Sequence, residues 1–384
     1  MIGVFVALVL ISVLAGTSYY LAYRLYQGFA SFFPGLRFWP VLVLVGVLAL
    51  ILVLGFGRAL MPFPEGLKRV LGLISGYFMG IALYLLLFTV AADLVLLIPK
   101  LVKLPFTAHP LFKGLVTLSV LLMTCITCVC GFANAQRIDH VSYEIRLQDK
   151  KDISDLTVVM ISDLHLGAIG SEGRLEEIVT EINVQKPDIV CIAGDFFDTD
   201  FSSIQDPEAA IQTLQGIQAT YGTYACLGNH DGGQTHDQMV AFLEQANIHP
   251  LSDAYTVIDK RLVLVGRLDA SPIGGYGEQK RQALAKICTW EDAALPVIVL
   301  DHNPANIHEY SAKADLILCG HTHKGQVFPG NLITNRMYTV DHGYYQKAPH
   351  SPHVIVTSGV GTWGMPMRVG TNCEIVTIRF SCDS

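Results

Sequence analysis

The first 136 residues contain four apolar runs, and each is long enough to cross a lipid bilayer as a helix. A helix rises about 1.5 Å per residue, so about 20 residues cross a hydrocarbon layer about 30 Å thick. Aromatic residues such as Tyr23 and Trp39 lie near the ends of the runs, as is typical of membrane interfaces. We therefore expect an all-α transmembrane region over residues 1–136. Its four spans are expected at about residues 2–23, 38–56, 70–98 and 111–135.

The charge distribution separates this region from the rest of the chain. Only 15% of the residues are charged, against about 25% in an average soluble protein. Residues 1–136 carry a net charge of +6, whereas residues 137–384 carry −13. This composition excludes a disordered chain and a nucleic-acid binder that relies on net positive charge. We expect a cell-membrane protein with several spans, whose partners are the bilayer and not nucleic acid.

The orientation in the membrane is less constrained. An even number of spans places the amino terminus and residues 137–384 on the same side. Five basic residues flank each side, so the positive-inside rule does not choose between them. The cysteines lack the spacing of a disulfide framework, which slightly favours a cytoplasmic domain. Asp93, inside the third run, is either an intramembrane polar site or an acid near a helix end that pairs with Lys100.

From residue 156 the pattern changes to short β-branched runs that alternate with amphipathic helices, which is typical of an α/β domain. The closing runs lack helices between them, so we expect antiparallel strands there. Residues 137–155 read as a connecting strand and a loop. Strands are expected at 156–162, 188–194, 221–228, 261–266, 296–301, 315–320, 353–359 and 373–380. Helices are expected at 171–185, 208–217, 235–246 and 278–288.

Polar side chains follow five of these expected strands. In α/β sheets, ligands bind beyond the carboxyl ends of strands, where such residues meet. Each short motif by itself occurs often by chance, but all five in this order rarely do. The residues are Asp163 and His165, then Asp195 and Asp198, then Asn229, His230 and Asp231, then His302, and finally His321 and His323.

Carboxylate, imidazole and amide ligands suit Mn²⁺, Fe²⁺/Fe³⁺, Zn²⁺ or Mg²⁺. Seven such ligands are too many for one tetrahedral site. They suit two divalent ions about 3.5–4 Å apart, which share one carboxylate and activate a bridging water as hydroxide for attack on phosphorus. The sequence therefore predicts a dinuclear site for phosphoryl chemistry.

These motifs resemble the calcineurin-like metallophosphoesterase superfamily. The resemblance rests on the motifs D-x-H (163–165), G-D-x-x-D (194–198), G-N-H-D (228–231), His302 before Asn-Pro, and G-H-T-H (320–323). The segments ISDLHLG (161–167), GHTHKGQV (320–327) and 358–380 are similar to a bacterial membrane-associated branch with a GHTHGGQ signature. The resemblance covers residues 137–384 and implies a two-sheet αββα sandwich.

The resemblance also implies roles for individual residues. One metal would be bound by Asp163, His165, Asp195 and His323, and the other by Asp195, Asn229, His302 and His321. His230 would act near the phosphate and the leaving oxygen, with Asp231 orienting or charging it. Asp198 would support the site. Lys324 departs from the branch, which has Gly there, and it either contacts phosphate or points to solvent.

The resulting expectation is a membrane-anchored, metal-dependent phosphohydrolase that acts on a phosphorylated small molecule or lipid. The membrane-associated UDP-2,3-diacylglucosamine pyrophosphohydrolases of this superfamily make a lipid-linked phosphoester or pyrophosphate the favoured substrate. The alternatives are a non-enzymatic metal-binding scaffold and a membrane sensor that uses the phosphoesterase fold as its output.

Overall fold

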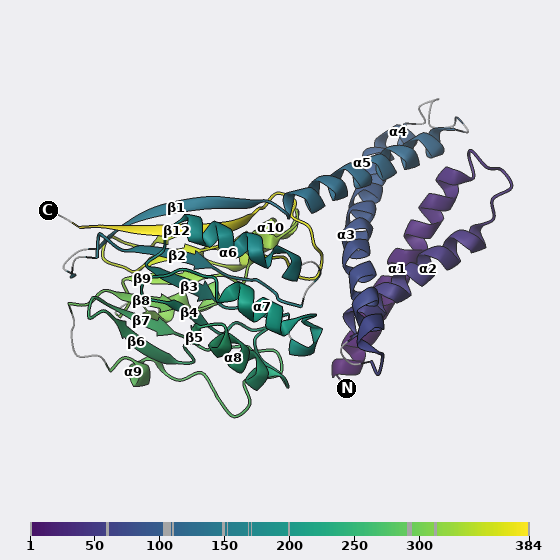
Figure 1. The fold of residues 1–384 in the computed structure, drawn as a ribbon. Helices are drawn as coiled ribbons and strands as arrows, with labels where there is room; N and C mark the ends of the chain where they lie inside the picture. Colours follow the sequence, from purple (N-terminus) through teal and green to yellow (C-terminus); the bar gives the residue numbers. More distant parts are fainter. Residues whose placement is uncertain are drawn as a thin grey trace. The chain divides into compact units, whose positions relative to one another are not determined.

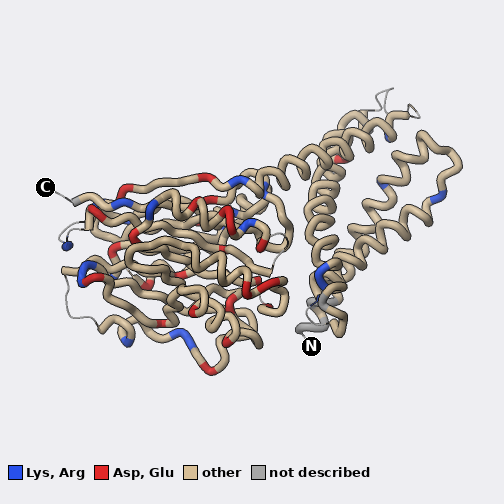
Figure 2. The backbone as a smooth tube through the Cα atoms, viewed as in Figure 1, with Lys and Arg blue, Asp and Glu red and all other residues tan. Residues whose placement is uncertain are grey.

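The computed structural model divides the chain into two compact units, Met1–Phe132 and Ala133–Ser384 (Figure 1). Charged residues are sparse in the first unit and numerous in the second (Figure 2). The residues that the structure describes are 2–58, 61–102, 109, 111–147, 150–151, 153–167, 169, 171–198, 200–289, 294–310 and 313–382.

The first unit is helical, as expected from its four apolar runs. Four of the described helices are long and apolar enough to cross a membrane, which confirms the all-α region that precedes the α/β domain. The third run is longer than expected at its start and is interrupted at Leu96. The helices are α1 (Ile2–Phe29), α2 (Phe38–Phe56), α3 (Glu65–Val95), α4 (Leu97–Leu101) and α5 (Phe112–Asn134).

Asp93 on α3 has partners that the sequence did not suggest. Its carboxylate forms an ion pair with Arg24 and accepts a hydrogen bond from the Tyr20 hydroxyl at 2.8 Å, and both partners lie on α1. Arg24, expected between spans, is part of α1. The intramembrane acid is therefore neutralised by a neighbouring helix within this unit.

The second unit contains two six-stranded mixed sheets, which confirms the expected α/β sandwich. The first has the order β1-β12-β2-β3-β4-β5 and the second β10-β11-β9-β8-β7-β6. The first sheet comprises β1 (Ile138–Leu147), β12 (Cys373–Cys382), β2 (Thr157–Ile161), β3 (Ile189–Ala193), β4 (Thr223–Cys226) and β5 (Ile248–Pro250). The second comprises β10 (Gly343–Gln346), β11 (His353–Val356), β9 (Leu316–Cys319), β8 (Val297–Leu300), β7 (Leu262–Gly266) and β6 (Ala254–Ile258).

Alternation along each strand builds the layers, because successive side chains point to opposite faces. In β2, Val158 and Met160 pack between the two sheets, whereas Val159 and Ile161 pack under the helices of the first sheet. The other face of the second sheet packs against α9 (Leu284–Ile287) and the short helix Pro304–Tyr310. The helices over the first sheet are α6 (Leu175–Val184), α7 (Pro207–Leu214) and α8 (His236–Gln245).

Two expectations about this unit were wrong in part. The helix expected at 278–288 is only the four residues of α9, because the Arg281 guanidinium reaches Asp301 and the Gln282 amide donates to Asp253, which draw the chain out of a helix. The closing strands are not uniformly antiparallel, since β11 runs parallel to β9 and β12 parallel to β1. The segment expected to connect the two regions is therefore the edge strand β1 of the first sheet.

Candidate metal centre

The predicted ligands come from loops that follow five parallel-running strands. Asp163 and His165 follow β2, Asp195 follows β3, and Asn229 follows β4 in the first sheet. His302 follows β8 and His321 and His323 follow β9 in the second sheet. Both sheets thus deliver polar side chains from their carboxyl ends, where ligands bind in α/β folds.

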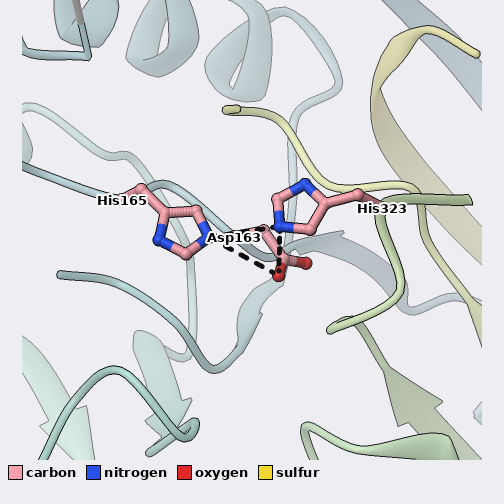
Figure 3. Close-up of side chains that lie close together, drawn as sticks. All are labelled: Asp163, His165 and His323. Carbon is pink, nitrogen blue, oxygen red and sulfur yellow. Dashed lines mark hydrogen bonds and ion pairs between the residues drawn. The ribbon is translucent and has the colours of Figure 1, made fainter. Parts of the chain in front are cut away.

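The first cluster consists of Asp163, His165 and His323 (Figure 3). His323 Nε2 lies 3.3 Å from Asp163 Oδ1 and 3.2 Å from His165 Nε2. His165 Nε2 lies 4.0 Å from the same carboxylate oxygen. All three side chains are buried, and their ligand atoms converge on one point.

The second cluster consists of Asp195, His302 and His321. His302 Nε2 lies 3.0 Å from Asp195 Oδ2 and 3.2 Å from His321 Nδ1. The same Asp195 oxygen lies 4.0 Å from His165 Nε2 of the first cluster. Asp195 is therefore the carboxylate that lies between the two clusters.

The backbone at these ligands adopts an unfavourable conformation. A positive φ is rare in residues other than glycine and persists only where the surrounding structure enforces it. Such residues concentrate at functional sites. It occurs here, with φ between 48° and 73°, at Asp163, His165, Asp195, His321 and His323.

Glycines let the backbone approach the carboxylates closely. A Cβ at Gly228 would lie 2.3 Å from Asp195 Oδ1 and 2.4 Å from the Asp195 backbone nitrogen. A Cβ at Gly320 would lie 2.5 Å from Asp163 Oδ2. The G-N-H-D and G-H-T-H motifs therefore require their first residue to lack a side chain.

Burial sets the protonation of the imidazoles. It lowers the pKa of His165 to about 3, and together with the charge on His302 it lowers the pKa of His321 to about 4. Burial and the neighbouring Arg368 place the pKa of His323 well below its usual range. These three rings are neutral at physiological pH, as metal ligands must be.

The carboxylates repel one another in the same small volume. Burial opposes ionisation of Asp195, but the adjacent His302 holds its pKa below the ordinary value. Burial and the charge on Asp195 raise the pKa of Asp163 to about 6. Burial would lower the pKa of His302, yet Asp195 and Asp163 raise it well above its usual value. The two buried carboxylates therefore attract a positive charge, which a bound cation would supply.

The donor set fits divalent cations. Asn229 Oδ1 is buried and has no hydrogen-bond donor among the described residues, which leaves an amide oxygen open as a ligand. The Nδ1 atom of His302 lies 2.8 Å from the Ala193 carbonyl oxygen. Donation of a hydrogen bond there fixes the ring and leaves Nε2 free for a metal.

The predicted catalytic residues differ in their surroundings. The His230 ring lies 5.1 Å from the His165 ring, and its backbone amide donates to Asp195 Oδ1 at 2.8 Å. Asp198 Oδ1 lies 3.9 Å from His165 Nδ1. Asp231 is fully buried and accepts hydrogen bonds from the backbone amides of Phe197 and Gly228. Its carboxylate therefore positions the loops that carry Asp195 and Asn229.

No role was predicted for three residues that lie beside these clusters. Arg368 is fully buried and donates to the carbonyl oxygens of Ser358 and Gly361 at 2.7 and 2.6 Å. It also donates to the His323 carbonyl oxygen at 3.0 Å, so it fixes the loop of the first cluster. The Trp363 ring lies 5.8 Å from the His230 ring, and Gln326 binds the Trp363 backbone. The only signal for them was their place in the segments 320–327 and 358–380, which supported the resemblance.

Lys324, which follows the predicted ligand His323 directly, has a φ of 51°. Glycine adopts this conformation without strain, whereas a lysine adopts it only where the surrounding structure enforces it. His342 Nε2 lies 3.1 Å from the buried carboxylate of Glu374.

Comparison with known proteins places the chain in a family. A family model described as calcineurin-like phosphoesterase matches residues 156–325. A metallophosphoesterase from Campylobacter jejuni is 30% identical over 298 residues, which cover 76% of each chain. A zebrafish protein named a transmembrane protein with metallophosphoesterase domain is 30% identical over 278 residues, or 68% of this chain and 62% of that one. This chain belongs to the metallophosphoesterase family, and the resemblance predicted from its motifs is confirmed.

A third relative carries a more specific name. It is the UDP-2,3-diacylglucosamine pyrophosphatase LpxG of Chlamydia trachomatis, which is 27% identical over 261 residues, or 54% of this chain and 78% of that one. The chain spans only 61% of the length of two Helicobacter pylori metallophosphoesterases that are 31% and 30% identical to it.

Proposed function

We propose that this protein is a membrane-anchored, dinuclear-metal phosphoesterase. The observation that carries the proposal is the convergence of the two ligand clusters on Asp195, with the open amide oxygen of Asn229 buried in the same loop region. Families of this kind bind divalent metals, and the described residues contain clusters suited to them. Two divalent cations would satisfy all seven side chains.

The ligand assignment follows the two clusters. One cation would be held by Asp163, His165, Asp195 and His323. The other would be held by Asp195, Asn229, His302 and His321. When bound, Mn²⁺, Fe²⁺/Fe³⁺, Zn²⁺ or Mg²⁺ would polarise the phosphoryl oxygens and make water a stronger nucleophile at neutral pH.

The remaining residues would act on the substrate and on the loops. The His230 imidazole would donate a proton to the leaving oxygen, as a general acid does. Its 9% exposure keeps the ring within reach of substrate but largely out of water. Asp231 would hold the loop that presents His230, and Asp198 would steady the His165 ring at 3.9 Å.

The proposed substrate class is a phosphoester or pyrophosphate, with a lipid-linked molecule favoured. Two observations support this choice: four of the described helices are long and apolar enough to cross a membrane, and a relative is named for a pyrophosphatase of a diacylated sugar nucleotide. We propose that residues 137–384 lie on the same side as the amino terminus, on the cytoplasmic face. The free, buried thiols of Cys191, Cys226 and Cys319 support that side, since reduced thiols are typical of it.

The test uses Asp195→Ala in the purified full-length protein. We expect bound Mn²⁺ to fall from two ions per chain and hydrolysis of a p-nitrophenyl phosphodiester to fall at least about 100-fold. The matched control is Asp237→Ala, which removes an exposed acid of α8. Unchanged hydrolysis by the Asp195→Ala protein would refute the proposal.

The same measurement separates the alternatives. A scaffold would bind metal without hydrolysing any phosphoester. A wild-type protein that neither binds metal nor hydrolyses a phosphoester would exclude the metal site itself. The sensor hypothesis relied on Asp93, which the structure pairs with Arg24. Full hydrolysis and normal membrane insertion of an Asp93→Leu protein would leave that hypothesis without support.

A further inference from the structure

Helix α10 (Gly330–Met337) has its polar and apolar faces reversed relative to a helix of a soluble domain. A surface helix normally buries its apolar face. Here Leu332, Ile333 and Met337 are 61%, 60% and 69% exposed. The inward face is polar: the Thr334 hydroxyl donates to the carboxylate of Asp341 at 2.8 Å, and Asp341 is buried.

Two aromatic side chains outside α10 are also exposed. Phe328, two residues before the helix, is 49% exposed, and Trp363 is 44% exposed. The Gln326 side chain bonds the Trp363 backbone in both directions at 2.8 Å, which fixes that loop beside the segment leading to α10. We call Phe328, Leu332, Ile333, Met337 and Trp363 the apolar rim. Because Trp363 also packs near His230, the rim borders the proposed catalytic residues.

The rim lies beside the point where the last apolar helix enters the domain. Asn134, the final residue of α5, donates from Nδ2 to the carbonyl oxygens of Arg368 and Thr371 at 3.3 and 2.9 Å. The Phe328 amide donates to the Val369 carbonyl oxygen of the same loop at 2.8 Å. The loop 368–372 therefore contacts both the segment that leads to the rim and Asn134 at the end of α5.

The charge on α10 suits a lipid surface. The helix contains no acidic residue, and the exposed Arg336 follows Leu332 by one turn on the same face. Apolar side chains with a basic residue among them are the pattern of helices that lie in a membrane interface and attract anionic headgroups.

We propose that the apolar rim docks into the interface of the bilayer that the chain spans, so that the metal centre opens against the lipid headgroups. The proposed docking does not depend on catalytic activity. Its consequence, access of a membrane-embedded phosphoester to the metal centre, rests on the proposed function.

The experiment uses the full-length chain in phosphatidylcholine–phosphatidylglycerol vesicles. The double change Trp39→Phe/Trp290→Phe leaves Trp363 as the only one of the three tryptophans. We expect lipids brominated near the headgroup end of their acyl chains to quench Trp363 fluorescence. Addition of Leu332→Asp/Ile333→Asp should abolish the quenching, and both positions are exposed enough to accept the change without unfolding. Val184→Asp, at a 62% exposed residue of α6, is the matched control and should leave quenching intact.

Equal Trp363 fluorescence in brominated and plain vesicles would overturn the docking, as would quenching that survives Leu332→Asp/Ile333→Asp. A second arm measures hydrolysis. The rim variant should keep its rate on soluble p-nitrophenyl phosphodiester and lose at least about tenfold on a diacylated pyrophosphate in vesicles, because two apolar anchors are lost. If the wild type cleaves neither substrate, the proposed function fails while the fluorescence result still decides the docking.

Discussion

Five candidate ligands hold a left-handed backbone at the turn that follows their strands. Each such residue costs about 1–3 kcal/mol, which neighbouring packing must offset. Buried partners provide that packing: the Asp163 amide donates to the Gly194 carbonyl oxygen at 3.0 Å, and Arg368 binds the His323 carbonyl oxygen. This backbone conformation orients side chains from two sheets toward one point, and the metal centre depends on it.

His230 gives the sharpest prediction at the residue scale. His230→Gln should lower kcat about 100-fold or more on an alkyl phosphodiester, because an alkoxide leaves poorly without a proton. The loss should be much smaller on a p-nitrophenyl ester, since nitrophenolate leaves without protonation. Steady-state kinetics on both substrates measure the difference, with His249→Gln, an exposed histidine of β5, as the control. Equal losses on both esters would exclude proton donation by His230.

Glu374 gives a pH prediction away from the metal ligands. Burial would raise its pKa, but His342 and hydrogen bonds from Ser358 and Thr357 hold the pKa below its ordinary value. A lowered folded-state pKa adds stability that is present above the unfolded pKa and is lost as pH falls through the folded pKa.

Glu374→Gln should therefore lower the free energy of unfolding by about 2 kcal/mol at neutral pH. The difference from wild type should shrink below about pH 4.5. Thermal unfolding across pH, with the exposed Glu176→Gln as reference, checks this. A difference that is constant from neutral to acidic pH would contradict it.

At the scale of elements, α9 and α10 are two helices that the periodicity of the sequence did not predict correctly. The pattern at 278–288 is that of a helix, yet side-chain bonds from Arg281 and Gln282 shorten it to α9. The segment of α10 carried no helix expectation, and its apolar residues face outward. Local pattern predicts a helix only where no tertiary bond competes for its backbone or side chains.

The ion pair between α1 and α3 predicts a coupling between the two helices. Arg24→Leu or Asp93→Leu alone removes one charge of the ion pair and leaves the opposite charge uncompensated by it, and each should cost about 3 kcal/mol of stability. The double variant should cost less than the sum of the two. Unfolding in detergent micelles measures all three proteins. Strictly additive losses would show that the pair contributes no interaction energy.

At the scale of the whole molecule, the two units are built for different solvents. The first lacks charge because ionised groups are costly in hydrocarbon, whereas the second carries a net −13 over residues 137–384. Part of that negative charge lies in the two buried carboxylates of the metal centre. A bound divalent cation should therefore stabilise the second unit and leave the stability of the first unchanged.

Loading and removal of metal test this difference in stability between the two units. Loading with Mn²⁺ at 100 times its dissociation constant should stabilise the second unit by about 2.7 kcal/mol, and chelation should reverse the gain. Hydrogen exchange resolved by segment should report increased protection in residues 133–384 and none in the spans. The Asp195→Ala protein serves as the metal-insensitive control. Equal protection of the spans would contradict independent units.

Much of the fold could be predicted because periodicity and polarity are local properties. Runs of apolar residues predicted the four helices, and short β-branched runs predicted β2, β3, β8 and β9 to within about one residue at each end. Short strands with mixed composition, such as β5, β6 and β10, were missed because their pairing depends on distant partners. The metal ligands were predicted because their motifs follow strands directly, but their assignment to a metal remains a proposal.

The sequence by itself determined which solvent each part of the chain tolerates and which side chains stand at the strand ends. Those properties are local, since hydration and strand-end position depend on neighbouring residues. Only the tertiary structure decided that Asp195 lies between the two clusters, that Asp231 binds backbone amides, and that Asp93 pairs with Arg24. These contacts join residues tens of positions apart, and only a folded chain brings such residues together.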